Sequence, residues 1–272
     1  MKPSMFGMKP SVLRKTLFFF AGFCLGSLPL VAQSRAPDIP VVLVQGGTFA
    51  MGARTLDPAS PGRKVTVSSF YLGQTVVTQG QYQAVTGKNP SRFLGELLPV
   101  ERVSWYDAVQ FCNQLSILDG YQPAYTINGT QVTWNQKSNG WRLPTEAEFE
   151  FAARGGLKSK GYAFAGSNVA NEVAIHFYDS GGRTHPVKGL APNELGLYGM
   201  CGNVWEWCWD WFTPNLSSLP SVNPIGPAQG TDRVNRGGSW NDDFDDALRP
   251  YYRADDGPGT KESEMGFRLA RN

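Results

Sequence analysis

The pattern of apolar and polar positions along the chain predicts short strands and short helices separated by many turns. Apolar runs over residues 41–44 and 47–52 predict an opening hairpin, and residues 65–72 predict another strand. Two further apolar stretches within residues 125–134 are separated by Asn128-Gly129. They predict a second hairpin, because this dipeptide favours a two-residue turn.

Three helices are predicted from the polar residues that begin them. In each, a Ser or Thr stands three residues before a Gln, Asp or Glu, the spacing at which two residues cap the first helical turn. The pairs are Thr78 with Gln81, Ser104 with Asp107, and Thr145 with Glu148. The predicted helices end at Gly87, residue 115 and Gly155. Glu146 and Glu150, on either side of Glu148, do not converge with it on one point, so we interpret the three as helix-favoured or buried acids and not as catalytic groups.

Residues 205–211 alternate in a way that predicts a strand with an aromatic face. The tryptophans share this face, while Glu206 and Asp210 lie on the other; the tryptophans are Trp205, Trp207, Trp209 and Trp211. An aromatic stripe of this kind is interpreted as core in preference to a sugar platform. Glu206 needs a partner among these rings, either a cation or an arginine.

The last forty residues contain two apolar, glycine-containing stretches, residues 233–240 and 265–271, around a polar segment with no apolar period. A polar segment fixed at both ends predicts a surface held for contact with a ligand. The predicted contact residues are Trp240, Asn241, Asp242, Asp243, Asp245, Asp246, Leu248, Tyr251, Tyr252, Ala254, Asp255 and Asp256. The alternative is a solvated acidic loop that binds nothing.

Composition indicates a single loop-rich domain that leaves the cytosol. The chain has 272 residues, 41% of them hydrophobic, with 31 Gly and 19 Pro. Four basic residues and an apolar run within residues 1–32 predict a signal peptide, processed either by cleavage after Ala32 or by lipidation of Cys24 for membrane attachment. Residues 33–40 are then a linker, and residues 41–272 the domain.

Removal of residues 1–32 changes the formal charge from +2 to −2, because four basic and no acidic residues are lost (2 − 4 = −2). This balance argues against a nucleic-acid partner. Three cysteines remain, Cys112, Cys201 and Cys208. Either Cys201 and Cys208 form a disulfide or all three are core thiols. With two histidines in the chain, a His-rich metal site is not expected.

Five motifs together resemble the formylglycine-generating enzyme family. They are Gly46-Gly47-Thr48-Phe49-x-Met51-Gly52, Arg142-Leu143-Pro144-Thr145-Glu146, Gly202-Asn203-Val204-Trp205-Glu206-Trp207, Arg236-Gly237-Gly238-Ser239-Trp240 and Gly266-Phe267-Arg268, in the order of the family over residues 41–271. The resemblance implies an α+β fold, a variant of the C-type lectin fold with small antiparallel sheets, few short helices and neighbouring termini.

The resemblance also implies where family chemistry would lie. The enzymes oxidise a sulfatase cysteine with oxygen and copper, using two cysteines whose positions correspond to Asp242 and Ala247 here. Without thiolates there is no soft ligand pair for copper, so we expect no catalysis. No cofactor is expected to be required. A structural calcium ion is implied at the Gly202 and Val204 carbonyls with Glu206, and a second at Asn171, although Gly199 replaces an upstream ligand of the first site.

Variable proteins diversified by retroelements use the same fold, and residues 241–264 resemble their variable segment in composition. The resemblance implies an exported, surface-displayed ligand-binding protein at the cell surface or outer membrane. Its contact region, residues 240–264, would lie on a rigid scaffold. The expected partner is an extracellular protein or surface ligand of basic or polar character, and the chain is expected to be a monomer. The alternatives are a formylglycine-generating type of oxidase and a calcium-dependent lectin.

Overall fold

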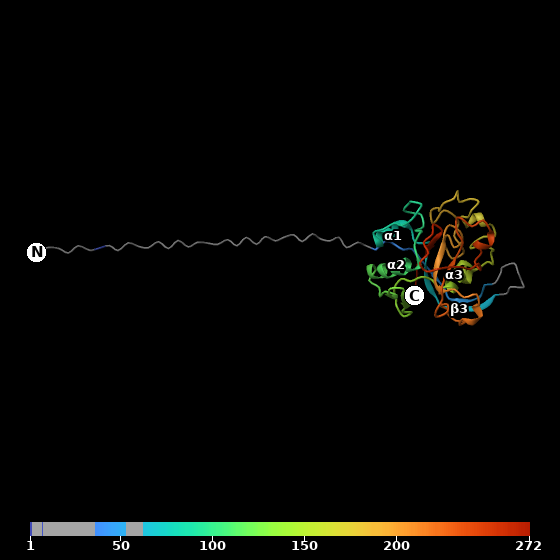
Figure 1. The fold of residues 1–272 in the computed structure, drawn as a ribbon, viewed down its shortest axis with the longest axis horizontal. Helices are drawn as coiled ribbons and strands as arrows, with labels where there is room; N and C mark the ends of the chain where they lie inside the picture. The colour runs from blue at the N-terminus through green and yellow to red at the C-terminus, as the bar shows by residue number, and fades with distance from the viewer. Residues whose placement is uncertain (2–6, 8–35, 53–61) are drawn as a thin grey trace. The chain divides into compact units, whose positions relative to one another are not determined.

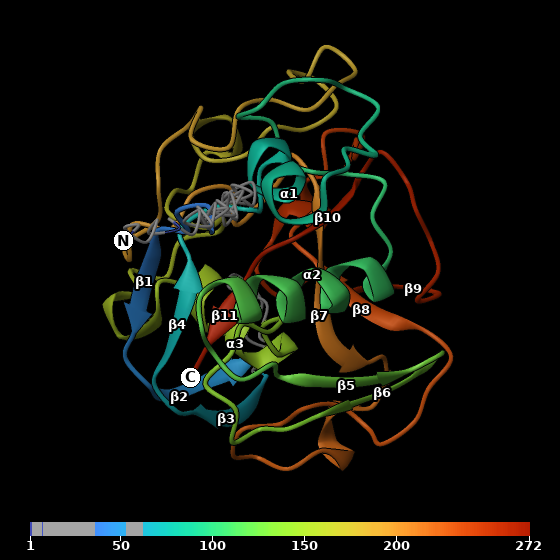
Figure 2. The same ribbon diagram turned by 90° about the vertical axis from the view of Figure 1, so that its left-hand side faces the viewer.

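The first and last strands of the domain lie in one three-stranded sheet. In the computed structural model, which describes Met1, Gly7 and residues 36–52 and 62–272 (Figure 1), strand β4 (Phe70–Gly73) lies between β1 (Val41–Val44) and β11 (Ala270–Arg271). Both neighbours pair antiparallel with β4 (Figure 2). The implied proximity of the two ends of the domain is therefore confirmed. The predicted signal peptide and Cys24 lie outside the described residues.

The predicted opening hairpin is wrong. Strand β1 pairs with β4, whereas β2 (Gly47–Met51) pairs with β3 (Arg63–Val67) in a separate two-stranded sheet. Gly46, which joins β1 to β2, lies against the corner between β3 and β4, where an added Cβ would be 2.6 Å from the carbonyl oxygen of Val67. This close approach lets the chain pass from one sheet to the other.

The predicted strand over residues 65–72 is interrupted at the same corner, at Ser68 and Ser69. The Ser68 amide donates to Asn223 Oδ1 (2.8 Å), and Ser69 Oγ accepts from the Gly46 amide (2.9 Å). Side-chain hydrogen bonds thus replace strand pairing at this point.

The three predicted helices and the second hairpin are confirmed. Helices α1 (Gln79–Thr86), α2 (Trp105–Leu118) and α3 (Glu146–Ala153) all begin with the expected capping boxes, and α2 extends three residues beyond its predicted end. Strands β5 (Tyr125–Asn128) and β6 (Gln131–Trp134) pair antiparallel around Gly129. Short 3-10 helices occupy Gly156–Lys158, Ala170–Glu172, Leu216–Ser218 and Asp245–Leu248.

A four-stranded sheet connects the core to the C-terminal segment. Its order is β10 (Met265–Phe267), β7 (Trp205–Trp211), β8 (Arg233–Arg236) and β9 (Ala254–Asp256), with β10 parallel to β7. Trp207 packs in the core cluster around α2, and the neighbouring Cys208 packs in the cluster around α3. Because β7 is covered on both faces, Trp207 and Trp209 are confirmed as core, and Glu206 is buried as well. Trp205 and Trp211, at the two ends of the strand, are half-buried.

The cysteines are core thiols and not a disulfide pair. Cys112, Cys201 and Cys208 are free and buried. Burial raises the pKa of all three thiols and keeps them protonated. Within residues 36–52 and 62–272, no helix combines the length and apolar character needed to cross a bilayer.

Candidate ligand-binding surface

Two glycines direct the chain out of the core at the start of the predicted contact segment. Gly237 and Gly238, directly after β8, have φ values of 101° and 77°, which disfavour other residues. A Cβ on Gly238 would also lie 2.9 Å from Leu248 Cδ2 and 3.0 Å from the Ala247 carbonyl oxygen. The Gly-Gly pair therefore allows the segment to fold back closely on itself.

Arg236 fixes the backbone of the contact segment from beneath. Its guanidinium is buried, pairs with Glu150 of α3 (2.5 Å) and donates to the carbonyl oxygens of Pro250 (2.9 Å) and Tyr252. These acceptors are main-chain atoms, so the support does not depend on which side chains Pro250 and Tyr252 carry. A buried ionic pair of this kind holds the loop only while both partners remain.

Arg253 attaches the segment to α3 a second time. Its Nε and Nη2 donate to the two carboxylate oxygens of Glu146 at 2.5 and 2.9 Å, and its Nη1 donates to the Thr213 carbonyl (2.8 Å). Glu148 pairs instead with Arg142. The interpretation of the α3 acids as partners of other side chains is confirmed for all three, since each pairs with an arginine. Glu146 also lies 3.6 Å from Arg236 Nε, so Glu146 and Glu150 both contact the Arg236 guanidinium.

Asp242 caps the turn that follows the Gly-Gly pair. Its Oδ2 accepts from the Ser239 amide (2.7 Å) and hydroxyl (2.8 Å), and its carbonyl accepts from the Phe177 amide (3.0 Å). Burial raises the pKa of Asp242, while the Ser239 hydrogen bonds oppose this shift. Asp242 therefore positions the segment and joins it to the loop around Phe177.

Two predicted contact residues are buried, which corrects their role. Trp240 is 6% exposed and donates to the Ser263 carbonyl (3.0 Å), and Leu248 is 1% exposed. Both pack beneath the surface, where they hold the segment and do not reach a ligand. Ala247, which the family resemblance implies to stand at a cysteine position, is also buried.

The other predicted residues divide between two places. Asn241, Asp243 and Asp245 are exposed on the turn, and the half-buried Asp246 accepts from the hydroxyl of Tyr251 (2.7 Å). Tyr252 is half-buried beside them. Three predicted residues lie on β9, at the edge of the sheet, with Asp255 exposed and the other two half-buried; they are Ala254, Asp255 and Asp256. The turn forms one surface, and β9 contributes a separate acidic edge.

The predicted contact residues did not include four aromatic residues on or near the turn, namely Phe177, Tyr178, Trp205 and Phe244. Phe244 is 45% exposed and contacts Tyr252, which in turn contacts Trp205. Phe177 and Tyr178 are 51% and 73% exposed on the loop that is hydrogen-bonded to Asp242. We call the aromatic–acidic surface the set Phe177, Tyr178, Trp205, Asp243, Phe244, Asp245, Asp246 and Tyr252. The sequence feature that would have indicated this second loop is the pair of adjacent aromatic residues, Phe177 and Tyr178.

The carboxylate implied for the first calcium site does not fit that ion. Both oxygens of Glu206 accept from Arg268, at 2.7 and 2.8 Å, so the partner of Glu206 is an arginine and not a metal ion. The Gly202 carbonyl accepts from the Val204 amide (3.0 Å), and Asn171 Oδ1 lies 3.1 Å from His176 Nε2. Across the part of the chain that the structure describes, no three His, Cys, Asp or Glu side chains gather as a metal site.

Comparison with known proteins identifies the family of the chain. Residues 29–272 match the family model of the sulfatase-modifying factor enzyme 1-like domain. The chain belongs to this family. It is 35% identical to the chaperone protein LppX of Paenibacillus barcinonensis over 96% of this chain and all of that protein. It is 38% identical to the formylglycine-generating enzyme of Streptomyces coelicolor, over 85% of this chain and 88% of the enzyme.

A solved structure is similar to that of the chain. Treponema denticola variable protein 1 is 34% identical and superposes with a TM-score of 0.77, covering 85% of this chain and 94% of that one. The predicted C-type lectin fold of the formylglycine-generating enzyme type is thereby confirmed, as is the resemblance to a variable protein.

Proposed function

We propose that this family member is a ligand-binding protein that contacts its ligand through the aromatic–acidic surface and performs no catalysis. One observation supports this most strongly: Arg236, Arg253 and Asp242 hold the segment, while Asn241, Asp243 and other side chains on the turn remain exposed. A fixed backbone with free side chains reduces the ordering cost of binding.

The separation between residues that hold the segment and side chains that are exposed on it favours diversification of residues 240–264. Asn241, Asp243 and Asp245 are exposed and can change without disturbing the contacts of Arg236. The similarity to Treponema denticola variable protein 1 supports this part of the proposal. Export and display at the cell surface or outer membrane, by the predicted signal peptide or lipidated Cys24, would bring the segment to outside partners.

The absence of catalysis is proposed from the positions that correspond to the family's cysteines. Asp242 is occupied as a turn cap, and Ala247 is packed in the interior. The three described thiols are buried and protonated, which removes them as nucleophiles or copper ligands. The similarity to the Streptomyces coelicolor enzyme favours the alternative, an oxidase that generates formylglycine.

The aromatic–acidic surface favours a basic peptide or protein segment as ligand. Of its acids, Asp246 lies 3.8 Å from Arg249, whereas Asp243 and Asp245 form no ion pair with any residue that the structure describes. Aromatic side chains beside acids bind the stems and charged heads of Lys and Arg. Electrostatic attraction between the acids and a basic partner also makes association faster at low salt.

A panel of fluorescent peptides of equal length, differing in net charge, tests the proposal by anisotropy. We expect basic peptides to bind and acidic ones not to bind, with affinity falling as salt rises. The double variant D243N/D245N should weaken binding about tenfold and leave stability within about 0.5 kcal/mol. The charge-matched control D38N/E96Q changes two exposed acids elsewhere and should bind normally. Equal binding of acidic peptides, or equal losses in both double variants, would refute the proposal.

A further inference from the structure

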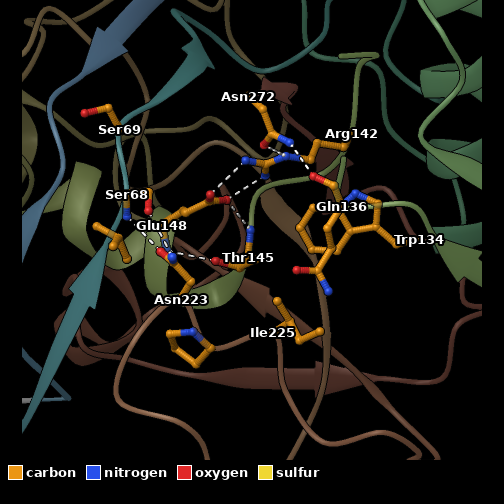
Figure 3. A pocket seen from close by; sticks show the side chains of 12 residues that line it. Ser68, Ser69, Trp134, Gln136, Arg142, Thr145, Glu148, Asn223, Ile225 and Asn272 are labelled. Carbon is orange, nitrogen blue, oxygen red and sulfur yellow. Dashed lines mark hydrogen bonds and ion pairs between the residues drawn. The ribbon is translucent and has the colours of Figure 1, made fainter. Parts of the chain in front are cut away.

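A cavity of about 260 Å³ lies outside the aromatic–acidic surface and shares no residue with it. Its walls come from the corner between β3 and β4, the β5–β6 hairpin, the first turn of α3 and residues 223–225. In Figure 3, Trp134 and Gln136 line one side, Ser68 and Asn223 line the other, and Thr145 lies between them. Neither the proposed binding function nor the family's cysteine positions involve this cavity.

The side chains that line the cavity carry no net charge. Its single Arg and single Glu, Arg142 and Glu148, pair through two hydrogen bonds of 2.7 and 2.8 Å. The Thr145 amide gives Glu148 a third hydrogen bond (2.8 Å). Each charge is therefore already compensated, and a charged ligand would have to compete with a buried, well-formed pair. This arrangement selects against ions and in favour of a neutral ligand.

Polar groups with unused hydrogen-bonding capacity line the cavity. The Gln136 amide is exposed and makes no side-chain hydrogen bond within the described residues. The buried Trp134 Nε1 also lacks an acceptor among those residues. The hydroxyls of Thr145 and Ser69 accept from backbone amides (3.2 and 2.9 Å), which leaves their own protons to donate. The lining thus offers both donors and acceptors in addition to the Trp134 indole.

The walls are also held in place before any ligand arrives. Asn223 and Ser68 exchange two hydrogen bonds, of 2.8 and 2.9 Å, across one side. Asn272 links the other side by accepting from Arg142 Nε (2.9 Å) and donating to the Gln136 carbonyl (2.9 Å). Preformed walls lower the entropic cost of capturing a small molecule.

We propose that this cavity binds a neutral polyhydroxylated ligand the size of one monosaccharide unit, without a metal ion. The volume lies just below the roughly 300 Å³ at which pockets for drug-sized ligands begin, which fits a ligand of this size. Hydroxyl groups match the mixed donors and acceptors, and the C–H face of a sugar ring matches Trp134 and Ile225. The pairing of Arg142 with Glu148 is the reason why a neutral ligand is proposed.

Saturation-transfer difference NMR with the full-length domain tests the proposal. The neutral probes are the methyl glycosides of glucose, galactose and mannose, and N-acetylglucosamine; the charged probes are glucuronate and glucose 6-phosphate. We expect at least one neutral probe to bind in the millimolar range, unaffected by EDTA, and its charged counterparts to bind at least about tenfold more weakly. Failure of every neutral probe, or loss of binding in EDTA, would overturn the proposal.

Variants locate the binding. Gln136→Ala should weaken it about fivefold to tenfold, and Gln136→Trp should abolish it by filling the cavity from an exposed position. Gln131→Ala, at an exposed position of the same hairpin outside the cavity lining, is the matched control and should bind normally. Thermal melting checks that each variant is folded. Unchanged sugar binding in Gln136→Trp would refute this site. Peptide binding at the aromatic–acidic surface should be normal in both Gln136 variants, so the two proposals are tested independently.

Discussion

Arg268 holds the carboxylate of Glu206 in the core, where neither side chain is appreciably exposed. Burial raises the pKa of Glu206, and the charge of Arg268 opposes the shift. We expect Arg268→Met to lower the free energy of unfolding by about 3–5 kcal/mol, because it leaves Glu206 buried without a partner. Urea unfolding at neutral pH measures the loss. The double variant E206L/R268M should recover part of it, and no recovery would show that the pair is not the cause.

The raised pKa of Asp210 should make the free energy of unfolding depend on pH. Burial, followed by the charge of Glu146, raises the pKa of Asp210 well above its ordinary value. The native state therefore binds this proton more tightly than the unfolded state. The resulting stabilisation is complete below the unfolded pKa, about 3.9 for Asp, and is lost as pH rises through the folded pKa.

Asp210→Asn removes this titration and keeps an oxygen for the Glu146 amide, which Asp210 Oδ2 now accepts at 2.8 Å. Relative to the native protein, we expect the variant to become progressively more stable as pH rises above about 4. Urea midpoints at a series of pH values test this. Parallel profiles for the two proteins would contradict the assignment of the titration to Asp210.

At the scale of elements, helix α3 is the platform on which the contact segment is held. Arg253 joins the segment to Glu146 of α3, and its side chain is 15% exposed. A double-mutant cycle between Arg253→Met and Glu146→Gln should give a coupling energy of about 1–3 kcal/mol. Hydrogen exchange should speed up in residues 250–256 of Arg253→Met.

Arg249→Met is the control for that cycle, because Arg249 belongs to the same segment but pairs with the partly exposed Asp246 at 3.8 Å. A pair of this kind contributes about 0–1 kcal/mol. Faster exchange in both variants to the same extent would show that α3 does not anchor the segment through Arg253.

Elements whose ends are set by nearby residues were predictable from the sequence. All three helices begin at their expected caps, and the hairpin at Gly129 forms as expected. The opening hairpin failed because β1 and β2 each pair with a strand beyond residue 62, and apolar alternation does not specify a partner. Pairing is decided by contacts such as that of Gly46 with Val67, which are distant in sequence.

The candidate surface was likewise predictable only in part. Its acids and Tyr252 were identified because a polar segment without periodicity lies between two strands. The burial of Leu248 depends on the fold-back at Gly238, and the contribution of Phe177 depends on its hydrogen bond to Asp242, 65 positions away. Tertiary contacts of this range leave no local pattern in the sequence.

At the scale of the whole molecule, the interior of the domain isolates every described thiol from solvent. Cys112 lies in α2, Cys208 in β7 and Cys201 in the loop before β7, and burial raises the pKa of Cys201 to about 12. We expect the folded domain, prepared without residues 1–32, to be unreactive toward Ellman's reagent. All three thiols should react after unfolding in guanidinium, because none is in a disulfide.

The same isolation bears on the choice between binding and oxidation. A cysteine-containing sulfatase peptide, incubated with the domain, added copper and oxygen, should yield no aldehyde in mass spectrometry, since a buried protonated thiol neither binds copper(I) nor captures a substrate cysteine. A formylglycine-generating enzyme assayed in parallel is the positive control. Aldehyde formation by this domain would favour the oxidase, and rapid labelling of a native thiol would identify the residue responsible. If neither occurs, the exposed side chains on the turn remain the part of the segment that can contact a partner.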